Sequence, residues 1–190
     1  MFEKHKKSGF SVLEIVVSLA LFAFVVLLVN SMFVMSQKTY NSGSNKSELA
    51  QNVRVSLDRL SREVRQAEEI ITALPATDDD TDFPPTNELF FQNGHDISQT
   101  TYIRYYLDGS NLMRSEISYY FSSDPSIYVR WDSLDESSQP PDTLVLENNI
   151  VGEYFSNLEF WGEDNLINIS CLLNKRDTSL EVDTKVFSRN

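Results

Sequence analysis

A long run of apolar residues near the amino terminus limits what this chain can fold into more than any other feature of its sequence. The run spans residues 10–29, and only Ser11, Glu14 and Ser18 interrupt it. A membrane-spanning helix needs about 20 predominantly apolar residues. A buried core helix of a soluble protein is disfavoured, because the segment is apolar on all sides and follows a basic tip. We therefore expect a transmembrane helix over residues 10–40.

Residues 1–9 read as a short leader that contains three lysines and a single glutamate. The positive-inside rule places this leader on the cytoplasmic side. In a secretory signal, small residues follow the apolar region at the cleavage site, whereas Ser8 and Gly9 precede it here. We therefore expect the apolar helix to stay attached. The chain is then a single-pass protein of the cytoplasmic (inner) membrane, with an extracytoplasmic carboxyl-terminal domain.

A second apolar pattern predicts an amphipathic helix over residues 46–74, because its apolar residues recur at steps of three and four. Residues 41–45, Asn-Ser-Gly-Ser-Asn, predict a bend or a weak joint between the two helices. Pro75 predicts the end of the second one. The stripe suits either a coiled-coil seam or a helix packed on a sheet, and we favour the sheet. The stripe consists of Leu49, Val53, Leu57, Leu60, Val64, Ala67, Ile71 and Leu74.

Residues 75–190 are predicted to form a β-rich domain. Asp108, Gly109 and Ser110 lie between two strand-like segments and predict a hairpin, because Asp-Gly favours positive φ. Alternation in the segment 166–173 predicts that Cys171 lies on a buried face. The predicted fold is α+β, with a long amino-terminal helix, its first half transmembrane, packed on an antiparallel sheet. The expected strands are 88–92, 100–107, 111–117, 127–131, 143–147, 154–161, 166–173 and 179–187.

Composition and motifs argue against several classes of function. The formal net charge of -12 opposes direct nucleic-acid binding, because a phosphate backbone selects basic surfaces. The single cysteine excludes a disulfide within the chain. The sequence contains no H-E-x-x-H, no C-x-x-C and no glycine-rich phosphate loop. We therefore expect no enzymatic activity.

An acidic loop is the one candidate for a cofactor, a calcium ion. It holds Asp78, Asp79, Asp80 and Asp82, and calcium binds several hard oxygen ligands at once. The loop lacks the glycine and the distal glutamate of an EF-hand. A solvated acidic loop without a metal is therefore the alternative interpretation.

Gly9-Phe10-Ser11-Val12-Leu13-Glu14, with a basic leader before it and an apolar helix after it, resembles the type IV prepilin processing signature. The resemblance implies that a prepilin peptidase/methyltransferase cuts between Gly9 and Phe10 and N-methylates Phe10. It also implies that Glu14 pairs with the amino-terminal ammonium of a neighbouring subunit, which offsets the desolvation of both ions. A Glu14 that is simply protonated in the bilayer is the alternative.

The sequence after residue 60 is similar to the larger minor subunits of this class, the J-type pseudopilin of type II secretion and the PilW-like minor pilin. The similar segments are 60–67, 101–114 and 149–160. The resemblance implies a structural subunit that primes assembly of a type IV pilus-like or type II secretion filament, or lies near its tip. Its partners are then the membrane and other major and minor pilins or pseudopilins. Secretion, adhesion or motility, and DNA uptake all remain open, as does a bitopic membrane-anchored binding module outside any filament.

Overall fold

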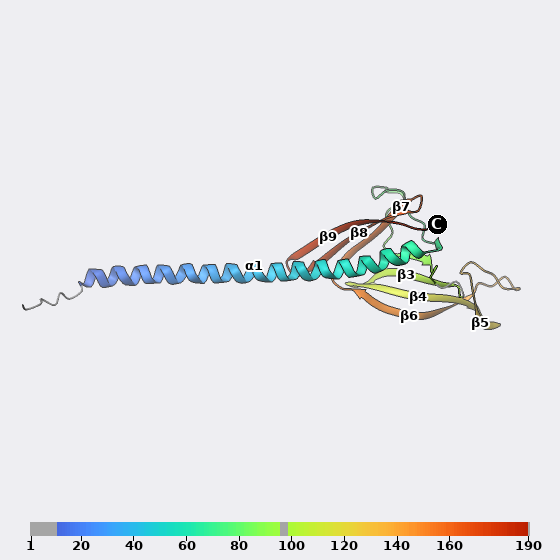
Figure 1. Ribbon diagram of the computed structural model, residues 1–190, viewed down its shortest axis with the longest axis horizontal. Helices are drawn as coiled ribbons and strands as arrows, with labels where there is room; N and C mark the ends of the chain where they lie inside the picture. Colours follow the sequence, from blue (N-terminus) through green and yellow to red (C-terminus); the bar gives the residue numbers. More distant parts are fainter. Residues whose placement is uncertain (1–10, 96–98, 190) are drawn as a thin grey trace, which may run out of the picture. The chain divides into compact units, whose positions relative to one another are not determined.

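The computed structural model describes residues 11–95 and 99–189 of the chain. Contacts divide the chain into two compact units, Met1–Ser44 and Asn45–Asn190. One helix, α1 (Val12–Gln66), begins in the first unit and ends in the second, and antiparallel strands follow it (Figure 1). The α+β class predicted from the sequence is therefore confirmed.

Within the first unit, the part of α1 from Val12 to Val29 is apolar on every side apart from Glu14 and Ser18. Each residue from Val12 to Ser44 is exposed, and the helix is long and apolar enough to cross a membrane. Ser31 and Thr39 donate their hydroxyl hydrogens to the carbonyl oxygens of Leu27 and Met35, at 2.9 and 3.0 Å. Such hydroxyl groups have their hydrogen bonds satisfied without water, as a lipid environment requires.

The bend predicted at residues 41–45 is wrong, because all five are helical. A single glycine costs a helix only about 1 kcal/mol relative to alanine. The helical hydrogen bonds on both sides of Gly43 outweigh that penalty. Nothing lies within 4 Å of the position that a Cβ would take at Gly43, so no close packing requires a glycine there.

The second unit holds the last part of α1 and two antiparallel sheets. In the first sheet, β4 pairs with β3 and β5 and also with β6. The strands of this sheet are β1 (Glu69–Ile70), β2 (Leu89–Gln92), β3 (Thr101–Asp108), β4 (Asn111–Phe121), β5 (Asp124–Val129) and β6 (Asp142–Gly152). The strands of the second sheet are β7 (Phe155–Glu163), β8 (Leu166–Lys175) and β9 (Thr178–Phe187).

The predicted hairpin joins β3 to β4. Asp108 pairs with Asn111, so the turn is the two residues Gly109 and Ser110. Gly109 has a φ of 60°, and a positive φ at the first turn position is the reason that glycine is favoured there. The strand β5 starts three residues earlier than the predicted 127–131, and β6 continues five residues beyond the predicted 143–147.

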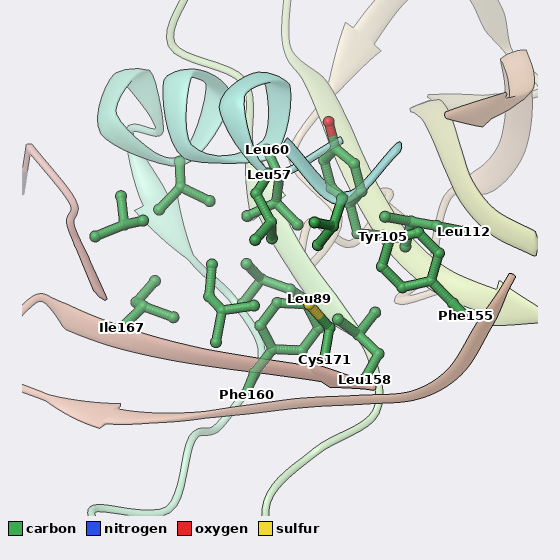
Figure 2. Packing of buried hydrophobic residues seen from close by; sticks show 14 of the residues in the cluster. Leu57, Leu60, Leu89, Tyr105, Leu112, Phe155, Leu158, Phe160, Ile167 and Cys171 are labelled. Atoms are coloured by element: carbon green, nitrogen blue, oxygen red, sulfur yellow. The ribbon is translucent and has the colours of Figure 1, made fainter. Parts of the chain in front are cut away.

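The core lies where α1 packs between the two sheets of the second unit (Figures 1 and 2). Leu49, Val53, Leu57, Leu60 and Val64 are buried along one face of the helix, as the apolar stripe predicted, and Ala67 is buried just after the helix ends. In Figure 2, Leu57 and Leu60 lie on the same side of the helix as Tyr105 from β3 and Phe160 from β7. Fully burying one such aliphatic side chain contributes about 1.5–3 kcal/mol.

The predicted end of the amphipathic helix is wrong. The helix ends at Gln66, and residues 69–70 form β1 against β2. The amide groups of Ile71 and Thr72 both donate to the carbonyl oxygen of Phe90, at 2.9 and 3.1 Å. The β-branched run Ile70-Ile71-Thr72 is favoured in extended chain. The prediction of one sheet is also incomplete, because α1 packs against two.

Candidate functional site

A reciprocal capping box fixes the first turn of α1. The backbone N–H of Ser11 donates to Glu14 Oε2 at 3.0 Å, and the N–H of Glu14 donates to Ser11 Oγ at 3.2 Å. Two backbone donors that a helix start would otherwise leave without partners are thereby satisfied. The carboxylate of Glu14 therefore lies over the positive end of the helix dipole, where a negative charge is favoured.

The other two residues of the predicted processing signature, Gly9 and Phe10, lie outside the described residues. Glu14 itself is exposed and sits among exposed apolar side chains such as Leu13 and Val17. A partner for Glu14 was expected from the sequence, whereas the capping role of Ser11 was not. The signal was present as Ser-x-x-Glu immediately before an apolar run, which is the capping-box pattern.

A buried ion network is the main polar feature of the second unit. The side chain of Arg114 in β4 is only 6% exposed, and its Nε lies 3.0 Å from both carboxylate oxygens of Glu63 in α1. Its Nη1 donates to Glu147 in β6 at 2.9 Å and its Nη2 to Glu116 at 3.3 Å. Tyr105 Oη donates to Glu63 Oε2 at 2.7 Å. The network therefore links the helix to three strands.

Burial and charge act together on the groups of this network. Burial, followed by the charge of Glu63, raises the pKa of Tyr105 above its ordinary value. Burial alone lowers the pKa of Arg114, but the hydrogen bonds and charge of Glu63 outweigh it and the net shift is upward. Both groups consequently keep the protonation state in which they donate hydrogen bonds. Arg59 adds a further contact to Glu63 at 3.3 Å.

An open cleft of about 600 Å³ lies beside the network. Its charged groups are largely paired with one another, since Arg59 and Arg114 both contact Glu63 and Arg114 also contacts Glu116. These contacts hold the helix and sheet together and do not converge on an empty centre. The cleft is lined by Arg59, Arg62, Glu63, Gln66, Asn93, His95, Ile103, Arg114 and Glu116.

The four aspartates of the acidic loop, the candidate calcium ligands, are not gathered into one metal-holding group in the part of the chain that the structure describes. No group of three or more His, Cys, Asp or Glu side chains that could hold a metal ion occurs within residues 11–95 and 99–189. In the loop, Asp80 Oδ1 accepts the backbone N–H groups of Asp82 and Phe83 at 2.9 and 3.1 Å. Asp80 is thus occupied by a local turn, and Asp78, Asp79 and Asp82 do not converge with it on one centre.

Cys171 is buried, as the alternation of β8 predicted. Its Sγ donates to the carbonyl oxygen of Val182 at 3.4 Å. Burial, with a smaller effect of Asp183, raises the pKa of the thiol to about 12. A thiol that stays protonated is a weak nucleophile. His95 is exposed in the segment after β2, where its backbone N–H donates to Asn93 Oδ1.

Comparison with protein-family models and with curated proteins finds no match to this chain. The amino-terminal turn of α1 carries a carboxylate, Glu14, and is followed by exposed apolar side chains. A single chain in water can neither cover these apolar side chains nor supply a counter-charge to Glu14.

Proposed function

We propose that this chain is a minor pilin or pseudopilin, a structural subunit of a type IV pilus-like or type II secretion filament. Its role is to prime assembly or to occupy a position near the tip. The observation that carries the proposal is Glu14, a carboxylate in the first turn of an apolar helix whose side chains are exposed from Val12 to Ser44. Such a helix needs lipid or neighbouring helices around it.

The charge of Glu14 explains why a neighbouring helix is favoured over lipid alone. Translocon-insertion scales put a charged side chain in a membrane helix at about 2.5–3.5 kcal/mol. The N–H of Ser11 supplies one hydrogen bond, but this neutral donor leaves the negative charge in place. An amino-terminal ammonium from a second subunit supplies both the remaining hydrogen bonds and the opposite charge.

Processing at the leader supplies that ammonium. In the proposed sequence of events, a prepilin peptidase/methyltransferase cuts between Gly9 and Phe10, and Phe10 becomes the N-methylated first residue. Glycine permits the close backbone approach that a protease requires. The lysines of residues 1–9 hold the leader at the cytoplasmic face until cleavage. The second unit then lies outside the cytoplasmic membrane.

The second unit supports the same proposal through its architecture. The last part of α1 carries a buried apolar stripe and packs on antiparallel sheets, which is the arrangement that the resemblance to larger minor pilins implies. The network around Arg114 fixes the helix on the sheet.

Incorporation of a Glu14→Ala variant into filaments tests the proposal. We expect normal membrane insertion and normal cleavage, because Gly9 and the apolar run are unchanged, with incorporation reduced at least ten-fold. Glu14→Gln, which keeps the shape and loses the charge, is expected to behave in the same way. Ser18→Ala is the matched control, since it removes another polar group from the same apolar run. The chain is quantified in purified filaments and in the membrane fraction.

Two results contradict the proposal. Incorporation of Glu14→Ala at the wild-type level shows that the carboxylate has no partner in the filament. A wild-type chain that remains in the membrane and never enters filaments identifies it instead as a membrane-anchored binding module.

A further inference from the structure

The strand β6 has an unpaired edge. Among the described strands, β6 pairs with β4 alone, and all nine residues from Asp142 to Ile150 are exposed. The unpaired edge of a strand presents backbone N–H and C=O groups that can pair with another chain. Native proteins usually protect such edges with lysine or proline, and residues 142–152 contain neither.

Apolar side chains gather on the same strand. Ten large apolar side chains of residues 45–95 and 99–189 are exposed, and Leu144, Val145, Leu146 and Ile150 of β6 are four of them. Three of these four are consecutive. Consecutive exposed apolar residues weaken the specificity of a fold unless they serve a function. The concentration on one unpaired strand therefore points to a binding surface.

The register of β6 places Val145 and Ile150 on one face of the strand, and Leu144 on the other. Val145 pairs with Ile117 and Ile150 pairs with Met113, and Met113 and Ile117 lie on the same face of β4 because they are four residues apart. Arg114 and its partner Glu147 take the opposite face, toward the helix. Glu147 is therefore turned away from Val145 and Ile150. A bulge at Leu146 separates two regular stretches, 142–145 and 147–150.

The negative charge of the residues around β6 indicates which kind of partner the strand can bind. Residues 115–153 contain eight acidic residues and one basic residue, Arg130, a formal net charge of -7. Arg130 is already paired with Glu69 and Asp132. A second copy of this chain brings the same acidic sector and a total formal charge of -12, which opposes self-association. A partner with basic residues is complementary instead.

We propose that the free edge of β6 binds an extended segment of a different polypeptide, one that alternates apolar residues with lysine or arginine. The added strand pairs its backbone with both regular stretches of β6, on either side of the bulge. Its apolar side chains cover Val145 and Ile150, and its basic side chains face the acidic sector. Main-chain hydrogen bonds supply affinity in this mode of recognition, and the alternate side chains supply specificity. The inference does not depend on the filament: it requires only a second polypeptide on the same side of the membrane.

Photo-crosslinking in cells that express the full-length chain tests this inference. A benzophenone side chain replaces Val145, which is 56% exposed, or Ile127 of β5, which is 58% exposed and serves as the matched control. We expect the probe at 145 to give a specific adduct that mass spectrometry maps to a segment with period-two apolar residues and a lysine or arginine. We expect the control probe to give at most one fifth of that yield.

Lysine substitutions on the exposed surface test the mode of binding without disturbing the core. Ile150→Lys places a lysine, a residue that protects natural strand edges, on the same face of β6 as Val145. It should lower the adduct yield at least five-fold. Ile127→Lys should leave the yield unchanged. Thermal melting of both variants checks that they fold.

Several outcomes overturn the inference. They are an adduct on a second copy of this chain, a partner segment without basic residues, equal yields from positions 145 and 127, and a yield that a folded Ile150→Lys variant does not reduce. An adduct whose partner sequence lacks the alternating pattern counts against it equally, whatever the identity of that partner.

Discussion

The guanidinium group of Arg114 holds α1 against the first sheet, because its nitrogens donate hydrogen bonds to carboxylates on three different elements. Glu63 lies in the helix, Glu116 in β4 and Glu147 in β6. Replacing such a buried ion network by apolar residues is often tolerated, whereas removing one partner leaves a buried charge uncompensated. The network therefore specifies the position of the helix more than it adds stability.

Glu63→Gln is expected to destabilise the second unit by about 3 kcal/mol, because Arg114 keeps a buried charge with weaker compensation. This corresponds to a fall in Tm of roughly 10 °C for a domain of this size. Arg59→Met is the control: it removes an i,i+4 pair whose arginine side chain is 41% exposed, so we expect a loss of about 0.5 kcal/mol or less. Thermal unfolding of the full chain, followed through Trp131 and Trp161, measures both.

A double-mutant cycle tests whether Arg114 and Glu63 affect the stability of the second unit as a pair or independently. The variant Glu63→Gln/Arg114→Met should recover part of the loss, because it removes the buried charge as well as its partner. Additive losses in the double variant contradict the interpretation that Arg114 and Glu63 act as a unit.

The thiol of Cys171 predicts a pH dependence of stability. Its pKa is raised to about 12 in the fold from an ordinary value of 9.0, so the protonated thiol contributes stability that is fully present below pH 9. That contribution falls between about pH 9 and pH 12, where the unfolded chain releases a proton that the folded chain keeps. The slope from one such group is at most about 1.4 kcal/mol per pH unit.

Chemical denaturation of wild type and Cys171→Val at pH values from 8 to 11 isolates this effect. The wild type should lose stability more steeply than the variant above pH 9. If both proteins lose stability equally steeply above pH 9, the loss is caused by groups other than Cys171. Tyr105 is such a group, because its pKa is also raised by burial.

At the level of elements, α1 lies so close to the end of β6 that residue 152 has no room for a side chain. Ser56 Oγ donates to the carbonyl oxygen of Val151 at 2.8 Å, and the N–H of Glu153 donates to Asn52 Oδ1 at 3.2 Å. Gly152 lies between these contacts, and a Cβ placed on it would overlap Ser56 Oγ and the ring of Phe155. The helix is thus hydrogen bonded to the end of β6.

Gly152→Ala should destabilise the second unit by about 1–3 kcal/mol, the usual range for overpacking a core. Gly43→Ala is the matched control, because a Cβ at Gly43 meets nothing within 4 Å. That substitution should leave the transition seen by Trp131 and Trp161 unchanged and stabilise the helix locally by about 1 kcal/mol. A Gly152→Ala variant that melts at the wild-type temperature contradicts the close approach.

Local sequence patterns predicted the elements well where the pattern and the tertiary structure agree. The stripe of α1, the Gly109 turn and the alternation around Cys171 each follow from residues that are near in sequence. The end of α1 was mispredicted because Ile71 and Leu74 continue the helical spacing, while pairing with β2 is a non-local contact. The second sheet and the Arg114 network depend on contacts between distant segments, such as Glu63 with Arg114, and no local pattern encodes them.

At the scale of the whole chain, the two units expose different surfaces. The described part of the first unit is a helix that exposes apolar side chains on every side. The second unit has its own core and a markedly acidic sector in residues 115–153. A membrane or filament environment suits the first surface, and an aqueous compartment with protein partners suits the second. The proposed subunit uses both.

The mass of the mature amino terminus tests the central proposal most directly. The chain is purified from the membranes of cells that contain a prepilin peptidase, and its amino-terminal peptide is analysed by mass spectrometry. The proposal predicts a peptide that begins at Phe10 and carries one methyl group on its amino nitrogen. A chain that retains Met1–Gly9, or one that is cut after the apolar helix, contradicts it.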